Sequence, residues 1–453
     1  MIHYRVGGIR VAEDISLDSM RSGGSDGRFN RRAIRVDEAQ GRVLAAAARA
    51  AIEQVPLAEA GGRRLAQQLL ATSDWPPFAR AGLDGYAVRA ADTAQASPES
   101  PAALRVIDTV AAGEPALAAV QPGTAARIMT GAPVPQGADA VVMLEQTAEG
   151  MAGDERTALV KAAARPGQNV APQGEEFRLG SPIAEPGELL RPGHIALLGT
   201  FGYADVPVYK RPRVAVFATG SELLPVAAPL APGLIRDSNS PMVAAMIRQH
   251  GGEPLLCGAL PDEPEAVREA LLGIGAEADM IVTTGGVSVG DYDAMAMLLR
   301  GLSPCEPAQQ LSGVSQERLL FNRVSMRPGS PTSAAWMGGK LVLALSGNPG
   351  ACFVGFELFA APALRAMQGD PSPQHRKWKA VLAREIGKGS PHDRYIRVSL
   401  QYGEDGRIYA DPLAFGKSSM TASIADAEAI AVIPSGRNGA AAGSIVEAWL
   451  LPQ

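Results

Sequence analysis

Residues 278–293 combine the residue types that bind phosphate and a divalent cation. Met280 to Val282 is a short apolar run, as expected of a strand buried on both faces. Small and polar residues follow it, namely Gly285, Gly286, Ser288, Gly290, Asp291 and Asp293. Glycines let the backbone approach a ligand closely, and amides at the start of a helix, expected here from Ala294, carry partial positive charge. A plain strand-to-helix turn is the alternative, but the serine and the two carboxylates favour a phosphate site with a bridging cation.

A second stretch has the same order of elements. Lys340–Leu345 is a predicted buried strand, helix 350–366 follows it, and Pro349 suits the first helical turn. Between them stand Ser346, Gly347 and Asn348. The carboxyl ends of parallel strands meet at one edge of a sheet, where α/β proteins bind ligands. We therefore expect both loops at that edge.

The composition narrows the class of protein. A chain of 453 residues is too long for one core and predicts about two to four domains. Hydrophobic residues make up 46% and charged residues 20%, which is ordinary for a soluble globular protein. With 42 basic and 47 acidic residues the net charge is −5, whereas a nucleic-acid binder should show a basic excess. Any phosphate site must therefore be local.

The cysteines and the apolar runs indicate the compartment. Cys257, Cys305 and Cys352 have no metal-ligand spacing and are odd in number, which fits a reducing cytoplasm. No apolar run reaches the roughly 18 residues of a membrane span, and the N-terminus lacks a signal-peptide core. We therefore expect a cytoplasmic protein that binds neither membrane nor nucleic acid.

The first part of the chain predicts a flexible polar tail, residues 1–32, and two small domains. Residues 33–77 and 165–207 are predicted to form one elongated linker-type domain, domain I. Its expected elements are a helix from Val36, a helix around Gly62–Leu70, and strands around Gly187–Leu190 and Ala204–Tyr209.

Residues 78–164 predict a small β-rich domain, domain II, because turn signals separate short apolar runs. The expected strands are Leu104–Val110, Ala125–Met129, Ala140–Leu144 and Ala158–Val160. Asp84 lies in an Asp-Gly turn and Thr130 at a strand end. Taken alone, both patterns are typical of turn structure.

Strands alternate with helices over residues 208–369, which predicts a three-layer α/β domain with a doubly wound sheet, domain III. The expected strands are Val214–Phe217, Leu255–Leu260, Met280–Val282, Val324–Met326 and Leu341–Leu345. Residues 370–453 predict a C-terminal β-barrel or sandwich, domain IV. Its expected strands are Ala380–Glu385, Tyr395–Leu400, Arg407–Ala410, Ala429–Ile433 and Ile445–Leu450. The fold class is therefore multi-domain, α/β plus β.

Five sequence motifs occur in one order along this chain. They are Leu83–Val88, Ile128–Pro135, Thr219–Leu223, Thr284–Asp293 and Gly347–Pro349. The series resembles the MoeA family, the molybdopterin molybdenumtransferases related to the C-terminal part of gephyrin. The resemblance runs from about Val36 to the C-terminus. Each motif is weak by itself, but the five in order across four domains are highly specific.

The resemblance implies a fold and an activity. It implies a MogA-like domain III, a homodimer, and an active site between domain III of one subunit and domain II of the other. It further implies insertion of molybdate into adenylylated molybdopterin, with release of AMP and with Mg²⁺. A MogA-like molybdopterin adenylyltransferase and molybdoenzyme apoproteins are the partners it implies.

The resemblance also assigns roles to single residues. Asp84 and Thr130 match residues that line the cleft from the partner subunit, and the catalytic acidic positions are Glu222, Asp262 and Asp293. Asp262 and Asp293 are the implied metal ligands. The implied substrate-binding residues are Gly220, Gly285, Gly286, Ser288, Gly290, Arg323, Arg327, Ser346, Gly347, Asn348, Pro349 and Ser418. In physical terms, carboxylates hold the cation and glycine amides hold the phosphates.

The chain departs from the family pattern at several of these positions. The family's Lys-Pro-Gly-Lys-Pro is Arg327–Pro331 here, with Ser330 in place of the second lysine, and Arg323 replaces a lysine four residues earlier. Further departures are Ser346 for Pro, Ser221 for Asp, and Ala79–Gly82 for Asp-Asn-Ser-Ala. Arginine keeps the charge of lysine but not its compact geometry.

Arg323 and Arg327 lie four residues apart on a possible strand, so both can point to one face. Under one interpretation, the two arginines only form ion pairs at the surface. Under the other, they donate charge-assisted hydrogen bonds to the oxygens of an anionic substrate.

Three alternative functions stay open. A divergent paralogue would bind pterin or nucleotide for cofactor delivery without insertase activity, and a gephyrin-like scaffold would bind protein partners. A molybdopterin-binding domain within another enzyme, as in CinA-type amidases, is disfavoured because domains I, II and IV match as well. The sequence does not distinguish molybdenum from tungsten, because their oxyanions have the same shape and charge.

Overall fold

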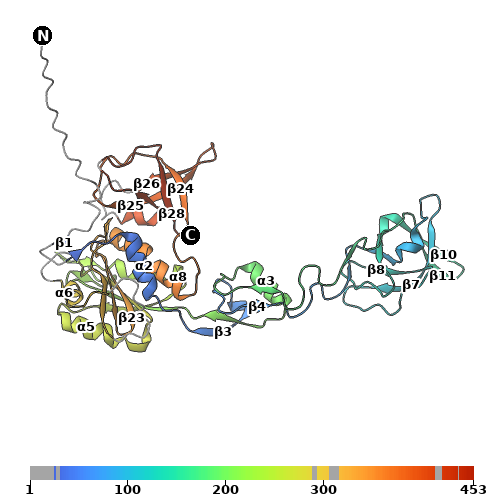
Figure 1. Ribbon diagram of the computed structural model, residues 1–453, viewed down its shortest axis with the longest axis horizontal. Coiled ribbons are helices and arrows are strands. Elements are labelled where there is room, and N and C mark those ends of the chain that lie inside the picture. The colour runs from blue at the N-terminus through green and yellow to red at the C-terminus, as the bar shows by residue number, and fades with distance from the viewer. Residues whose placement is uncertain are drawn as a thin grey trace, which may run out of the picture. The chain divides into compact units, whose positions relative to one another are not determined.

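The structure, a computed structural model, describes residues 25–26, 31–287, 293–305, 316–413, 421–436 and 438–452 (Figure 1). The chain divides into two compact units. Unit 1 comprises Met1–Glu53, Gly62–Ala66 and Pro207–Gln453, and unit 2 comprises Gln54–Gly61 and Gln67–Val206. Of the predicted tail, the pair β1 (Ser25–Asp26) and β2 (Arg31–Arg32) is described. The boundaries of domains I to IV stay predictions.

A sheet of six strands forms the centre of unit 1 within the described residues. Its order is β18 (Glu253–Ala259), β15 (Arg213–Ala218), β19 (Met280–Thr284), β23 (Lys340–Leu345), β22 (Ser333–Met337) and β20 (Arg318–Phe321). The first four strands are parallel. β22 is antiparallel to both of its neighbours, β23 and β20, so β20 runs in the same direction as the first four strands. All of β19 is buried, which explains why its sequence is apolar without alternation.

Helices cover both faces of this sheet. One face packs against α2 (Val36–Ala46), α4 (Asn239–Gln249) and the helical run 349–367. The other face packs against α5 (Pro264–Gly273) and α6 (Ala294–Arg300). Successive residues of β15 alternate between the two cores, as the pleat of a strand requires. The predicted doubly wound, three-layer domain is confirmed.

The helical run 349–367 consists of α7 (Pro349–Gly355), a π-helical turn (Phe356–Ala360) and α8 (Ala361–Met367). By length and hydropathy alone this run could cross a membrane. However, 89% of the most apolar part of this helical run is buried inside the protein. Its composition is therefore that of a core helix, covered by the sheet, by α2 and by α4.

The C-terminal strands of unit 1 form a closed barrel. They are β24 (Lys377–Leu382), β25 (Asp393–Tyr402), β26 (Ile408–Pro412), β27 (Ala429–Ile433) and β28 (Ile445–Leu450). The pairing of β25 with β27 closes the ring, so the predicted barrel or sandwich is a barrel. A short helix, α9 (Ala422–Ala425), precedes β27.

One strand predicted for the α/β sheet lies elsewhere. The expected strand at Val324–Met326 was wrong, because β21 (Met326–Arg327) pairs in parallel with β25 of the barrel. The remaining positions of the sheet belong to β22 and β20, which the sequence did not reveal. β22 consists of Ser-Ala-Ala-Trp-Met, which lacks the β-branched residues that mark a strand.

Unit 2 contains a second sheet of six strands among the described residues. Its order is β10 (Thr147–Ala152), β11 (Glu155–Val160), β7 (Ala102–Val110), β8 (Thr124–Ile128), β6 (Gly85–Val88) and β9 (Ala140–Met143). The short strands predicted for domain II are confirmed. Short elements elsewhere are β3 (Ile52–Pro56), β4 (Leu69–Leu70), β5 (Arg80–Ala81), β12 (Val170–Ala171), β13 (Pro182–Ala184), α3 (Pro192–Thr200) and β14 (Asp205–Tyr209).

Two predicted elements of domain I were wrong. The helix expected around Gly62–Leu70 is a glycine turn followed by β4, which pairs with β13. The strand expected at Gly187–Leu190 is irregular, and the helix α3 follows it instead. Two glycines inside α3 lower its intrinsic helix propensity, so the sequence did not predict this helix.

A buried ionic cluster joins the π-helical turn to the barrel. The Glu357 carboxylate Oε2 lies 3.2 Å from Nε2 of His250 and 3.0 Å from Nε2 of His375. The side chains of all three are at most 2% exposed. Burial alone would raise the pKa of the Glu357 carboxyl, but hydrogen bonds from His250 and His375 hold its pKa at about 2.

This low pKa predicts acid sensitivity. The folded-state pKa lies below the usual 4.5, so the carboxylate stabilises the fold fully above about pH 4.5 and loses this contribution as the pH falls toward about 2. We expect the free energy of unfolding to fall over this range more steeply in the wild type than in Glu357→Gln, which has no carboxyl group to protonate. Denaturant unfolding at several pH values measures both slopes. Equal slopes would contradict an ionised, hydrogen-bonded Glu357.

Candidate functional site

Three loops meet at the carboxyl edge of the parallel strands in unit 1. They follow β15, β19 and β23, at Thr219, Gly285 and Ser346. The Thr219 amide donates to the Thr284 carbonyl at 2.9 Å, and the Gly285 amide donates to the Leu345 carbonyl at 2.9 Å. The two loops predicted to share this edge therefore do so, joined by backbone hydrogen bonds.

The glycines in these loops permit a very close approach of backbone to backbone. Gly285 has φ +87°, and a Cβ there would lie 2.6 Å from Thr219 Oγ1. A Cβ on Gly347 would lie 3.3 Å from the Gly285 Cα. The Gly285 amide is already used by Leu345, so this amide holds the loops together rather than a phosphate. The tight-corner interpretation thus applies to Gly285.

A cavity of about 570 Å³, the carboxylate cavity, opens beside these loops. The predicted site residues that line it are Gly220, Glu222, Asp262, Gly285, Gly286, Asp293, Ser346, Gly347 and Asn348. Glu222 and Asp262 are exposed and Asp293 is half-buried. The structure therefore brings to one cavity the three carboxylates that the resemblance assigns to the site. Asp291, which the sequence pairs with Asp293, lies outside the described residues. Ser288, Gly290 and Ser418 lie outside the described residues.

Two of these side chains also have structural roles. Asp293 is the N-cap of α6, where its Oδ1 accepts a hydrogen bond from the Ala296 amide at 3.2 Å. Asn348 caps α7 in the same way, accepting from the Ala351 amide at 3.2 Å, and Pro349 is the first residue of that helix, as predicted. Among the described residues, no group of three or more His, Cys, Asp or Glu is placed to hold a metal.

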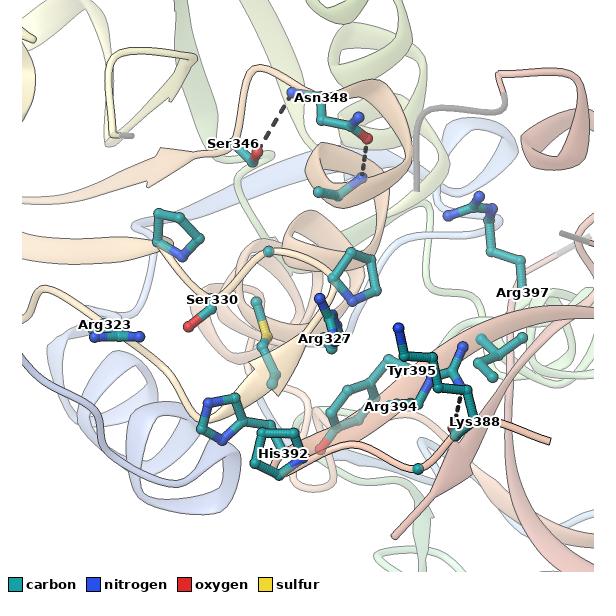
Figure 2. Close-up of a pocket in the computed structure, with 18 residues that line it drawn as sticks. Arg323, Arg327, Ser330, Ser346, Asn348, Lys388, His392, Arg394, Tyr395 and Arg397 are labelled. Carbon is teal, nitrogen blue, oxygen red and sulfur yellow. Dashed lines mark hydrogen bonds between the residues drawn. The ribbon is translucent and has the colours of Figure 1, made fainter. Parts of the chain in front are cut away.

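A second cavity of about 620 Å³, the basic cavity, adjoins the first and shares Pro331, Ser346 and Asn348 with it. Its cationic and imidazole side chains are Arg323, Arg327, Lys388, His392, Arg394 and Arg397 (Figure 2). None of its described lining residues is Asp or Glu. One wall comes from residues 323–331 and the start of α7, and the other from the barrel segment 388–397.

The charges of the basic cavity act on one another. Burial, followed by the positive charge of Arg327, lowers the pKa of Arg394. Burial, followed by the charges of Arg323 and Arg327, also lowers the pKa of His392. A bound anion would relieve this repulsion. The physical chemistry of the cavity therefore favours an anionic ligand with several oxygens.

Arg397 is the most deeply placed of these cations, at 4% exposure. Its Nε and Nη2 donate to the Ser423 hydroxyl at 3.2 and 2.9 Å, and its Nη1 donates to the Gly350 carbonyl at 3.1 Å. These partners are neutral, and burial lowers the pKa of the guanidinium. Arg397 thus presents positive charge to the cavity while tying the barrel to the start of α7.

Sequence reasoning missed the cations that the barrel contributes: Lys388, His392, Arg394 and Arg397. The available signal was the presence of His392, Arg394 and Arg397 in and beside a predicted strand, where charged residues are unusual inside a core. In contrast, Arg323 and Arg327 were identified, and the structure places both at one cavity. The Ser330 hydroxyl donates to the Val324 carbonyl at 2.8 Å and so stabilises the loop between them.

Asp84 and Thr130 lie together in unit 2. The amide and the hydroxyl of Thr130 both donate to Asp84 Oδ1, each at 2.7 Å. These hydrogen bonds, with a smaller contribution from the charge of Arg127, lower the pKa of Asp84. The Asp84 side chain therefore binds a second loop rather than only its own turn, and its carboxylate stays exposed.

Family comparisons assign each part of the chain. Residues 34–202 match the MoeA N-terminal region (domain I and II), residues 215–366 match a probable molybdopterin binding domain, and residues 379–451 match the MoeA C-terminal region (domain IV). The fold and both cavities therefore belong to a protein of the MoeA class.

Individual relatives agree with this class. The molybdopterin molybdenumtransferase of Bacillus subtilis (strain 168) is 40% identical over 376 residues, which cover 82% of this chain and 83% of the relative. The enzyme of the same name from Staphylococcus epidermidis is 38% identical over 81% of this chain and 83% of its own. The chain belongs to the molybdopterin molybdenumtransferase family.

A solved structure agrees as well. The molybdopterin biosynthesis MoeA protein from Pyrococcus horikoshii matches with a TM-score of 0.75 at 31% identity, covering 93% of this chain and 100% of that chain.

The double position of Asp293, in the cavity and at a helix cap, predicts different results for different substitutions. Asp293→Ala should lose both the carboxylate and the cap, whose loss costs about 0.5–2 kcal/mol of stability. Asp293→Ser keeps a capping oxygen and removes only the charge. We expect both variants to lose the Mg²⁺-dependent turnover that the family resemblance implies, measured by Mg²⁺ titration, and Asp293→Ala alone to melt at a lower temperature. Wild-type Mg²⁺ dependence in Asp293→Ser would restrict Asp293 to capping.

Proposed function

We propose that this chain inserts molybdenum from molybdate into adenylylated molybdopterin and releases AMP. Membership of the molybdopterin molybdenumtransferase family supports a transferase of molybdenum cofactor biosynthesis. The observation that carries the finer proposal is the pair of adjoining cavities of opposite charge, which share Ser346 and Asn348.

The basic cavity is the proposed site of the oxyanion and of the phosphate of the pterin. Several cations face a space whose described lining holds no carboxylate, so an anion gains more there than on an ordinary surface. Arg327 and Arg394 are the proposed hydrogen-bond donors to anion oxygens. A hydrogen bond to a charged group contributes roughly 1.5–3 kcal/mol.

The carboxylate cavity is the proposed site of the nucleotide and of Mg²⁺. Glu222, Asp262 and Asp293 offer the oxygen ligands that a hard cation prefers, and Mg²⁺ usually takes one or two carboxylates together with substrate phosphates. When bound, the cation would offset the negative charge that develops on the phosphates as AMP departs. The chain itself holds the carboxylates beside the strand-end loops. It holds the cations in the adjoining basic cavity, on the other side of Ser346 and Asn348.

The proposed assembly and compartment follow the family pattern. Asp84 and Thr130 lie in unit 2 and Asp293 in unit 1, which agrees with a homodimer in which each site takes residues from two subunits. A MogA-like adenylyltransferase would supply the adenylylated pterin, and molybdoenzyme apoproteins would receive the product. A cytoplasmic location fits the absence of a disulfide among the three described cysteines, Cys257, Cys305 and Cys352.

The direct test supplies purified protein with adenylylated molybdopterin, Mg²⁺ and either molybdate or tungstate. AMP release and formation of active cofactor are measured together. Binding of the pterin without AMP release would instead support the divergent carrier, and binding of neither substrate would support the scaffold. The two oxyanions in parallel also decide between molybdenum and tungsten.

Arg327 provides a graded test of the oxyanion site. We expect Arg327→Ala to weaken molybdate binding by about ten-fold or more, because it removes a charged donor from the cavity. Arg327→Lys, which restores the family residue, should be tolerated at least in part. Isothermal titration measures the affinity, and the melting temperature without ligand should change little. Unchanged molybdate and nucleotide affinity in both Arg327→Ala and Arg323→Ala would move the oxyanion site elsewhere.

Subunit mixing tests the shared site. Asp84→Ala and Asp293→Ala chains, each inactive alone, should recover part of the activity after exchange, because a heterodimer then contains one site with both wild-type residues. Activity is measured after mixing under conditions in which mass spectrometry verifies heterodimers. Verified heterodimers without activity would show that Asp84 and Asp293 act within one chain, or that Asp84 is only a turn residue.

A further inference from the structure

The buried cluster around Glu357 has no part in the proposed chemistry, yet it contains several ionisable groups at a junction. His250 is the C-cap of α4, Glu357 lies in the π-helical turn, and His375 lies in the segment that enters the barrel. Charged groups this deeply buried are costly unless their partners are complete. The hydrogen-bond partners of each ring nitrogen therefore reveal the protonation state of the cluster.

Both ring nitrogens of His375 face oxygens that can only accept hydrogen bonds. Its Nδ1 lies 2.9 Å from the Leu450 carbonyl oxygen. Its Nε2 lies 2.9 Å from the Glu357 carbonyl oxygen and 3.0 Å from the Glu357 carboxylate. An imidazole satisfies these contacts only when both nitrogens carry protons. His375 is thus an imidazolium ion, paired with the Glu357 carboxylate.

Unlike either ring nitrogen of His375, the Nδ1 of His250 must accept a hydrogen bond. Arg365 Nη1 lies 3.1 Å from its Nδ1, and a guanidinium can only donate, so this nitrogen must accept. Its Nε2 then carries the proton and donates to the Glu357 carboxylate at 3.2 Å. His250 is therefore neutral. A single carboxylate thus receives hydrogen bonds from two rings, one charged and one neutral.

The cluster joins the two structural bodies that form the basic cavity. On the barrel side, the His375 ring stacks on Trp449 at a centroid distance of 6.5 Å, and its acceptor Leu450 ends β28. From there β28 pairs with β27, and β27 pairs with β25, which carries Arg394 and Arg397. On the other side, the helical run that contains Glu357 begins at α7 next to Asn348 and Ser346.

We propose that Glu357 is a positioning residue for the oxyanion site. By holding His250 and His375 together, its carboxylate sets the barrel against the helical run and so positions the start of α7 in the basic cavity. The remainder of that wall is held to the barrel by the pairing of β21 with β25. Arg397, which donates to the Gly350 carbonyl, is the second tie between the same two bodies. The effect on oxyanion affinity rests on the proposed function, whereas the arrangement of the junction does not.

The test uses the full-length protein and compares Glu357→Gln with Met337→Ala. Met337 is 1% exposed and pairs with Lys340 at the end of β23 that is distant from both cavities. Met337→Ala therefore destabilises the core without changing any residue of the junction, and serves as the control. Hydrogen exchange follows the junction directly, and titration with molybdate or tungstate follows the site. Since Glu357→Gln could fail to fold, His375→Asn, which keeps a donor but loses the charge, is the second variant.

We expect Glu357→Gln and His375→Asn to speed amide exchange in β28 and β25 and to weaken oxyanion binding by about ten-fold or more, since small misplacements of binding groups are costly. Met337→Ala should lower the melting temperature with unchanged oxyanion affinity. Nitrogen-15 NMR of the wild type at pH 7 should show His375 with both ring nitrogens protonated and His250 with one.

Each result bears on one part of the proposal. A neutral His375 ring, or wild-type exchange at the junction in both variants, would overturn the arrangement of the cluster. Faster exchange with unchanged oxyanion affinity would overturn the positioning role. Absence of oxyanion binding in the wild type would overturn the proposed function, while exchange and NMR would still decide the state of the junction.

Discussion

The close contact between three strand-end loops is the constraint on which the rest of the site depends. Four parallel strands deliver their carboxyl ends to one edge, but the loops can lie against one another only because Gly285 and Gly347 have no side chain. The Thr219 and Gly285 amides then close the contact with hydrogen bonds to Thr284 and Leu345, the last residues of the neighbouring strands. The carboxylate cavity is the space left beside this contact.

Opposite charges are kept apart across one shared wall. Glu222, Asp262 and Asp293 come from the loops of the α/β sheet, whereas Lys388, His392, Arg394 and Arg397 come from the barrel. Their placement on two structural bodies gives each cavity a described lining in which the charged side chains have one sign. In the proposed reaction, the carboxylate cavity would take the metal-bound phosphates of the nucleotide, and the basic cavity would take the separate oxyanion.

The sequence predicted those features whose signal is local. β15, β19 and β23, the barrel strands and the carboxylates at strand ends all follow from apolar runs and turn residues. β22 pairs with β23 across the two-residue turn Gly338-Gly339, so its signal was local, but the alanine-rich run before that turn did not look like a strand. The pairing of β21 with the barrel does depend on contacts distant in the chain. The cations of the barrel could not be assigned to the site either, because a charged residue in a predicted strand does not indicate which cavity that strand will face. Glu357 was equally invisible, since its partners His250 and His375 are assembled only by the tertiary fold.

The departures from the family motif can be judged from the charge of the whole basic cavity. Ser330 removes one lysine of the family pattern, and its hydroxyl serves the loop through the Val324 carbonyl. However, Arg323 and Arg327 keep their positive charge, and the barrel adds Arg394, Arg397 and Lys388. Because an anion responds to the sum of nearby charges, the loss of one lysine leaves the cavity strongly positive. In the proposed oxyanion site, planar arginine donors would change the preferred geometry of the bound oxygens more than they change the field, so we expect the departures to tune oxyanion binding rather than abolish it.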